Sequence, residues 1–245
     1  MRTESDLLGE LQIPETAYYG VQTQRAINNF KISTNYLSHY PEFIKALGVV
    51  KLGAAEANHE LGILSKELFE AISFASNELI NGKYTDQFPI DMIQGGAGTS
   101  TNMNANEVIA NIALEHLGKQ KGDYQFCSPN DHVNLSQSTN DAYPSALKLA
   151  LFDMNKPLVD ALTNLYLAFD KKAKEFENVI KMGRTQLQDA VPMTLGQEFE
   201  GFANTLHKEV DNLNRIAAEL LVINMGANAI GTGLNAVPGY AQLCT

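Results

Sequence analysis

The chain has 245 residues, of which 44% are hydrophobic and 19% are charged, and its formal net charge is −10 at pH 7. This composition is ordinary for a globular protein and argues against an intrinsically disordered chain. The acidic balance also argues against a nucleic-acid-binding protein, because phosphate contacts need a basic face.

The first half of the chain predicts helices joined by irregular segments. Residues 1–41 contain two prolines and scattered turn residues, so we expect them to be irregular. Residues 42–81 carry apolar side chains at helical spacing, and a further helix is predicted over residues 103–117, where Gly118 ends it. The segment 88–93 is the best candidate for a strand, and its signal is weak.

The second half of the chain carries two long apolar seams. Apolar residues recur every three or four positions over residues 147–180, which places them on one face of a single helix. Pro157 lies within this seam and predicts a kink that does not end the helix, and Gly183 closes the seam. A second seam covers residues 195–220, with Gly226 as its predicted stop.

The length of these two helices predicts self-association. A helix of roughly 40 residues is about 60 Å long, whereas a compact globule of this chain length has a radius of gyration of about 18 Å. Two such helices cannot bury their apolar faces on each other alone. We therefore expect long antiparallel helices that pack on other copies of the same chain.

The environment of the protein is predicted from three features. The N-terminus lacks the apolar run of a signal peptide. The uncharged stretch 220–245 is too polar, and too interrupted by glycine and proline, to span a bilayer. Cys127 and Cys244 form no CxxC motif and are typical of a reducing compartment. We expect a soluble, cytoplasmic protein with neither a nucleic acid nor a membrane as its partner.

The first candidate binding segment is the glycine-rich stretch 94–104. Its glycines allow tight turns, and Thr99 then lies where a helix begins and where free backbone N–H groups favour anions. The stretch is neither a P-loop nor a full GxGxxG fingerprint. A plain turn followed by a helix cap explains the same residues.

Two more polar stretches also lead into predicted helices. Ser138, Thr139 and Asn140 offer more donors and acceptors than a helix cap needs, although capping alone explains any one of them. The link 183–194 between the two long helices is longer than most helix connections, and a crossover loop without chemical function is the alternative.

The residues themselves favour a small anionic ligand. The five histidines are dispersed without HxxxH or HExxH spacing, so a protein-held metal site is not expected. No GxSxG nucleophile motif is present. Neutral hydroxyl and amide donors at helix starts suit a ligand that carries carboxylates.

At these same stretches the chain resembles the aspartase/fumarase superfamily. The resemblance covers nearly the whole chain in order, and it rests on the motifs LLGE…AYYGVQTQRA (7–26), QGGAGTSTNMNANEV (94–108), PNDHVNLSQSTNDAYP (129–144), GRTQLQDAVPMTLGQEF (183–199) and GANAIGTGLN (226–235). It implies an all-α fold, with a mostly helical N-terminal lyase domain over 1–137 and part of a long antiparallel helical bundle over 138–245. It also implies a homotetramer whose active sites each take residues from three subunits.

The resemblance implies a set of substrate-binding residues. Thr99 matches the threonine of the family's GTS motif. The S-[ST]-N motif corresponds to Ser138, Thr139 and Asn140. Thr185 matches the threonine of the GRT motif, and Gln186 follows it. Fumarases usually have a histidine where Gln186 stands, and they also differ at Ser128 and His132, so the chain looks more like the aspartase branch.

The reaction implied is the reversible elimination of ammonia from L-aspartate to give fumarate, through an aci-carboxylate intermediate. The alternatives are a fumarate hydratase, an argininosuccinate- or adenylosuccinate-type lyase, and a non-catalytic helical assembly module. The resemblance implies no cofactor.

One departure from the family concerns the general base. In the family this base is a serine in a GSSxMPxKxN loop, and no such segment occurs before Thr245. We therefore expect no catalytic residue within this chain. We also expect the chain to be a fragment or a truncated product with little activity by itself.

Overall fold

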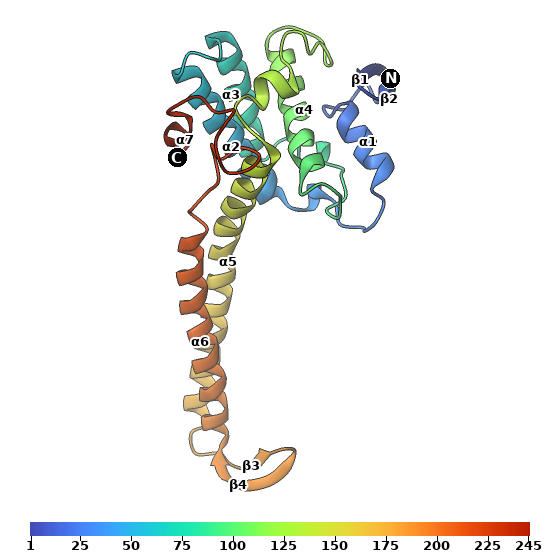
Figure 1. The fold of residues 1–245 in the computed structure, drawn as a ribbon. Coiled ribbons are helices and arrows are strands. Elements are labelled where there is room, and N and C mark those ends of the chain that lie inside the picture. Colours follow the sequence, from blue (N-terminus) through green and yellow to red (C-terminus); the bar gives the residue numbers. More distant parts are fainter. The chain divides into compact units, whose positions relative to one another are not determined.

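The structure is a computed structural model that describes all 245 residues. Helices dominate it, and its only sheets are two antiparallel hairpins, which confirms the expected all-α class. The chain divides into two units (Figure 1). Unit 1 comprises Met1–Ala150 and Ile223–Thr245, and unit 2 comprises Leu151–Val222.

The N-terminal segment of unit 1 is more regular than its sequence predicts. Strand β1 (Arg2–Asp6) pairs with β2 (Gly9–Ile13), and helix α1 (Val21–Asn29) follows. The prediction that residues 1–41 are irregular is therefore wrong for these elements. The hairpin turn is closed by the Asp6 carboxylate, which accepts the Leu8 N–H at 2.9 Å, and by Gly9 with a φ of 110°.

Three helices form the core of unit 1. They are α2 (Pro41–Glu60), α3 (Lys66–Ile80) and α4 (Thr99–His116). Segment 42–81 is thus two helices, because the chain turns at Gly62 and Ser65 then caps α3. Helix α4 and its end before Gly118 agree with the prediction.

Short helical turns and one bridge complete the connections of unit 1. The turns are η1 (Leu37–His39), η2 (Thr85–Gln87) and η3 (Pro129–Val133). Segment 88–93 forms only an isolated bridge between Tyr36 and Asp91, so the predicted strand is wrong. The Asp91 carboxylate accepts the N–H groups of Ile32, Ser33 and Ile93, and three backbone hydrogen bonds to residues 35, 37 and 38 also hold this segment.

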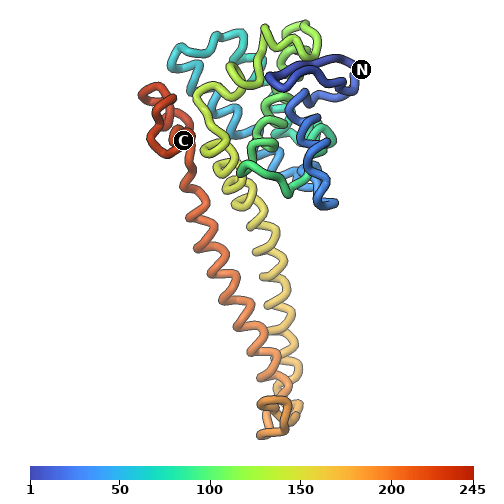
Figure 2. The backbone as a smooth tube through the Cα atoms, turned by 45° about the vertical axis from the view of Figure 1, so that its right-hand side comes forward, coloured from blue at the N-terminus to red at the C-terminus, as the bar shows by residue number.

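Unit 2 is built from two long helices and a hairpin. Helix α5 (Thr139–Glu175) starts in unit 1 and continues through Pro157, and α6 is Leu195–Glu219. Figures 1 and 2 show the two helices side by side in unit 2. Aromatic rings link them: Phe169 of α5 contacts Phe199 and Phe202 of α6, with ring centroids 5.7 and 5.6 Å apart.

The segment between the long helices is a hairpin, and here two predicted helix ends are wrong. Helix α5 stops at Glu175 rather than near Gly183, and α6 stops at Glu219, well before Gly226. Strands β3 (Ile180–Thr185) and β4 (Gln188–Thr194) pair instead. Their two turn residues, Gln186 and Leu187, have φ of 49° and 68°, as tight hairpin turns require.

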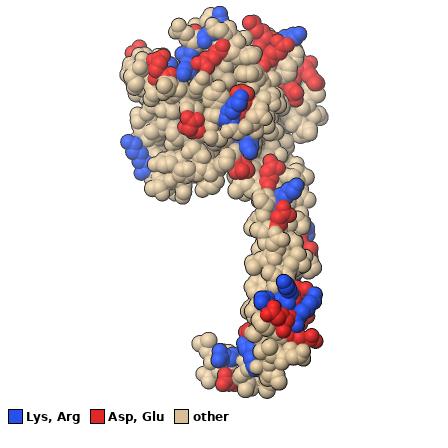
Figure 3. Space-filling model, turned by 180° about the vertical axis from the view of Figure 1, so that it is seen from behind, with Lys and Arg blue, Asp and Glu red and all other residues tan.

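Charged side chains on the visible face of unit 2 gather towards the hairpin end (Figure 3). Helix α5 ends there with ion pairs between Lys172 and Glu175 and between Lys174 and Asp170. None of the helices combines the length and the apolar content that a bilayer crossing needs.

The last residues return to unit 1. Segment 223–245 ends with the short helix α7 (Tyr240–Leu243), whose Tyr240 is fully buried in the core. Asn228 of this segment donates its backbone N–H to the Asp141 carboxylate at 2.9 Å. The start of α5 is therefore held by the far end of the sequence.

Candidate functional site

The first turn of α4 is shaped by the glycine-rich loop before it. Gly96, Ala97 and Gly98 all have positive φ, and Thr99 is the first helical residue, as predicted. The Thr99 hydroxyl donates to the Gly96 carbonyl at 2.7 Å. Gln94 accepts the Thr101 N–H at 3.1 Å, so a side-chain amide satisfies one free donor of the helix start.

The first turn of α5 holds the second candidate segment. The Ser138 hydroxyl accepts the Asn140 N–H at 3.2 Å, and the Asp141 carboxylate accepts the Ser138 N–H at 2.8 Å. The Asn140 side chain donates to the Ala229 carbonyl at 2.8 Å. The Thr139 hydroxyl accepts from the Asn102 amide at 3.3 Å.

These two helix starts are neighbours within unit 1. Besides the contact between Asn102 and Thr139, Gly98 lies against the ring of Tyr143, so closely that a Cβ atom would overlap it. The structure thus brings the Thr99 segment beside Ser138, Thr139 and Asn140, which the sequence had singled out separately.

Lys51 of α2 lies beneath these helix starts and was not predicted. Its side chain is fully buried, and Nζ donates to Asn102 Oδ1 at 2.7 Å, Asn134 Oδ1 at 2.9 Å and Gln137 Oε1 at 2.8 Å. Burial lowers the pKa of Lys51 to about 7, and the carboxylate of Asp141 opposes that shift. The available signal was a lysine in the otherwise uncharged run 47–55.

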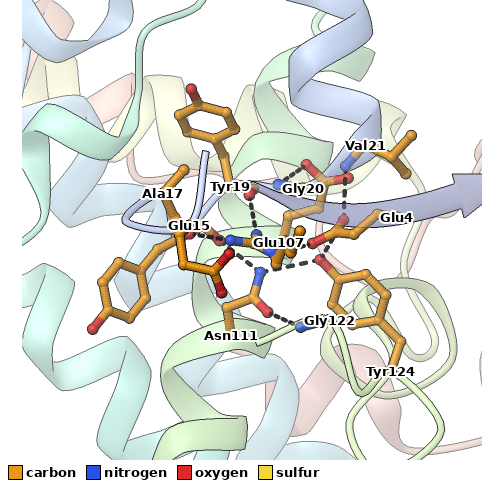
Figure 4. Close-up of polar contacts among 12 residues, drawn as sticks. Glu4, Glu15, Ala17, Tyr19, Gly20, Val21, Glu107, Asn111, Gly122 and Tyr124 are labelled. Carbon is orange, nitrogen blue, oxygen red and sulfur yellow. Dashed lines mark hydrogen bonds and ion pairs between the residues drawn. The ribbon is translucent and has the colours of Figure 1, made fainter. Parts of the chain in front are cut away.

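A second buried cluster surrounds Glu107 of α4 (Figure 4). Its carboxylate accepts the backbone N–H groups of Gly20 at 2.8 Å, Gln22 at 2.7 Å and Thr23 at 3.0 Å. Burial raises the pKa of Glu107 to about 7, and these hydrogen bonds oppose the rise. Because its partners are the free donors at the start of α1, Glu107 caps a helix and anchors it to α4.

Glu4 completes this second cluster. It accepts the Val21 N–H at 2.9 Å and the Tyr124 hydroxyl at 3.1 Å, and it pairs with Arg2 at 2.7 Å. Burial raises the pKa of Tyr124, and the nearby carboxylates add to the rise. Both carboxylates of this cluster accept hydrogen bonds from groups of the protein itself. We therefore interpret the cluster as a structural anchor for α1 rather than as a site of reaction.

The remaining candidate residues lie in unit 2. Thr185 ends β3 and Gln186 begins the hairpin turn, and both side chains are exposed. The structure describes them within their own hairpin, so their meeting with the helix starts of unit 1 stays a prediction.

The site in unit 1 offers hydroxyl and amide groups together with one buried ammonium. The hydroxyls of Ser138 and Thr139 each accept a hydrogen bond from the protein, which leaves their own hydrogens for a ligand. Such an arrangement can bind and polarise a carboxylate.

Comparison with protein families matches residues 9–245 to a lyase family. Among curated proteins, the chain is 58% identical over 243 residues to an aspartate ammonia-lyase of Pseudomonas aeruginosa, and 55% identical over 244 residues to one of Escherichia coli. Each match covers 99% of this chain and 51% of the relative. The chain thus spans about half the length of the curated relatives it matches.

Two solved structures are also similar. A fumarate lyase:delta crystallin from Brucella melitensis, bound to cobalt, matches with a TM-score of 0.95 and 53% identity over 99% of this chain and 53% of that one. A recombinant class II fumarase from Schistosoma mansoni matches with a TM-score of 0.89 and 36% identity over 99% of this chain and 51% of that one.

Proposed function

The chain belongs to the lyase family of the aspartase/fumarase superfamily, and from this premise we propose that its protein reversibly eliminates ammonia from L-aspartate to give fumarate. The observation that carries the proposal is the group of uncharged donors where α4 and α5 begin side by side. The relatives named aspartate ammonia-lyase, at 55% identity and above, support the choice of substrate.

The proposed reaction needs a group that stabilises charge on a carboxylate. A base removes a proton from the carbon beside the β-carboxylate, and the charge that develops moves onto that carboxylate. We assign the donors there to Thr99, Ser138 and Thr139. Thr99 must turn its hydroxyl away from Gly96 to take part. Removal of one such donor typically costs about 3–4 kcal/mol of transition-state stabilisation.

The other substrate groups have candidate partners in both units. We assign Asn140 and Thr185 to the second carboxylate or to the amino group. Gln186 can orient substrate or water by hydrogen bonding, but an amide cannot titrate. We propose that the general base is supplied by residues other than those of this chain.

The same proposal extends to assembly and location. We propose a homotetramer in the cytoplasm, in which the hairpin residues Thr185 and Gln186 complete a site with helix starts from other subunits. We also propose that residues 1–137 act as the N-terminal lyase domain and residues 138–245 as part of the central bundle. Exposed apolar side chains along α5 and α6 support the assembly, because such faces gain stability when another copy covers them.

A second candidate function is the hydration of fumarate to malate. The 36% identity to the class II fumarase favours it. Gln186 disfavours it, since the family's fumarases usually place a histidine there.

The test uses the full-length protein that contains this chain. L-Aspartate and L-malate are supplied separately, and fumarate is followed by its ultraviolet absorbance. We expect fumarate from aspartate and none from malate, and a Ser138→Ala variant should lower kcat/KM by roughly 10²–10³. Thr205→Ala, on the exposed surface of α6, is the matched control and should leave kcat/KM unchanged.

Three outcomes would contradict the proposal. Turnover of malate without turnover of aspartate would favour a hydratase. A well-folded oligomer without activity on either compound would favour an assembly module. A high rate from the 245 residues by themselves would show that the base lies within this chain.

A further inference from the structure

The Lys51 ammonium determines which way three amide side chains face. Nζ carries only donors, so the atoms that Asn102, Asn134 and Gln137 present to it must be their oxygens. Three acceptors within 2.9 Å also match the three N–H bonds of an ammonium, whereas a neutral amine would offer two.

The orientation of Asn102 then determines the role of Thr139. With Oδ1 on Lys51, the Nδ2 group of Asn102 faces Asn134 Oδ1 at 3.1 Å and Thr139 Oγ1 at 3.3 Å. The Thr139 hydroxyl therefore accepts from the protein. Its single hydrogen remains available to donate elsewhere.

The rest of the network prevents these amides from turning over. The Asn134 amide donates to the Gln137 carbonyl at 3.3 Å, and the Gln137 amide donates to the Val133 carbonyl at 2.9 Å. Rotation of either amide would lose these bonds and would also turn an N–H towards the ammonium.

We propose that Lys51 is a positioning residue that orients the Asn102 amide, so that Thr139 accepts from Asn102 and donates to the substrate carboxylate. The inference rests on the proposed function for its last step, the donation to substrate. The orientation of Asn102 is independent of the substrate. Without the ammonium, Asn102 could present Oδ1 to Thr139, and the hydroxyl would then donate inward instead.

The kinetic test reverses this hydrogen bond in the full-length protein. Asn102→Asp keeps the shape and the contact with Lys51, but both of its carboxylate oxygens accept, so Thr139 must donate to one of them. We expect kcat/KM for L-aspartate to fall about 10²-fold, mainly through kcat. Against a Thr139→Val background, Asn102→Asp should cost much less activity than it costs in the unsubstituted protein, where Thr139 is present; the remaining cost is the lost bond to Asn134.

A matched variant separates this effect from general damage to α4. Asn104→Asp also buries a carboxylate in α4, where it loses a bond to the Gln87 carbonyl, and it should lower stability while leaving kcat unchanged. Wild-type kcat/KM in Asn102→Asp would overturn the inference. So would a double variant whose loss is the product of the two single losses.

A second measurement decides the inference whatever the substrate is. In the 245-residue chain with ¹⁵N-labelled asparagine, the Asn102 side-chain hydrogens should exchange at least about ten-fold faster in Lys51→Met than in the unsubstituted chain. Lys45→Met on the same helix is the matched control and should leave the exchange unchanged. Unchanged exchange in Lys51→Met would overturn the inference. If the Asn102 hydrogens exchange faster in Lys51→Met but the full-length protein does not turn over aspartate, only the proposed function is contradicted.

Discussion

At the start of α1, four backbone N–H groups point into two carboxylates. Val21 donates to Glu4, while Gly20, Gln22 and Thr23 donate to Glu107. Glu107 comes from α4, so the charge that caps one helix is carried by another. The pKa of this single carboxyl group therefore affects how α1 is held.

The pKa of Glu107 predicts a pH dependence of stability. Burial raises this pKa from 4.5 to about 7, so the folded chain binds the proton more tightly than the unfolded chain. The resulting stabilisation is complete below pH 4.5 and is lost as the pH rises through about 7. We expect this group to lower the free energy of unfolding by at most about 3 kcal/mol across that window.

Urea denaturation at a series of pH values measures this effect. The decline between pH 4.5 and 7.5 should be smaller in Glu107→Gln than in the unsubstituted chain. Glu200→Gln, at an exposed position on α6, is the control and should keep the full decline. Parallel pH profiles for Glu107→Gln and the unsubstituted chain would contradict the prediction.

Single residues of the site differed in how well the sequence predicted them. Thr99 and Ser138 stand in polar stretches before helices, and the structure places them at the helix starts, where that pattern predicts. Lys51 has no such local signal. Its three acceptors lie 51, 83 and 86 residues further along the chain, so only the packing of α2 against those segments reveals its role.

Among the elements, the hairpin β3–β4 was the least predictable. The apolar spacing continues past the end of α5 into Ile180, so periodicity extends the helix too far. The turn residues Gln186 and Leu187 adopt positive φ without the Asn-Gly or Asp-Gly signal that usually marks such turns. Pairing across the hairpin, rather than local preference, determines this element.

The start of α6 carries a reciprocal cap. The Thr194 hydroxyl accepts the Gln197 N–H at 3.1 Å, and the Gln197 side chain accepts the Thr194 N–H at 3.0 Å. We expect Thr194→Ala to lower the free energy of unfolding by about 1 kcal/mol. Thr205→Ala is the matched control within α6 and should change it by less than about 0.5 kcal/mol, because that hydroxyl bonds only to a carbonyl one turn back. Equal losses in the two variants, measured by urea denaturation, would contradict the role of the cap.

The loop before α4 predicts a difference between two glycines. Gly98 has a φ of 93°, and an added Cβ would overlap the Tyr143 ring, whereas Gly118 has a φ of 71° with open space around it. Both Gly→Ala variants should lose about 1 kcal/mol through backbone strain. Gly98→Ala should lose at least about 1 kcal/mol more, because the two helix starts must move apart. Thermal denaturation of both variants measures this difference, and a similar loss in both would show that the contact with Tyr143 is easily relieved.

At the scale of the whole molecule, unit 2 exposes a long apolar surface. Leu158, Leu165, Phe202 and Ile216 are each exposed by between 44% and 49%. The apolar spacing in the sequence predicted that α5 and α6 cannot bury their apolar faces on each other alone. The exposed fractions of these side chains are consistent with that prediction.

The exposed seam predicts self-association of the chain. Light scattering should show an oligomer, and a Leu165→Lys, Ile216→Lys double variant should shift it to a monomer, since two buried ammonium groups would oppose the contact. Leu7→Lys, at the exposed tip of the first hairpin, is the control and should leave the mass unchanged. A monomeric unsubstituted chain would contradict the prediction.

Unit 1 is discontinuous along the chain, and this affects how it can be made. The hydrogen bond from Asn228 to the Asp141 carboxylate joins residues that the ribosome adds 87 positions apart. At 5–20 residues per second, the nascent chain spends roughly 4–17 s without that partner. During this interval the place of Tyr240 in the core is also unfilled, so unit 1 stays open to chaperones and proteases until residues 223–245 have been synthesised.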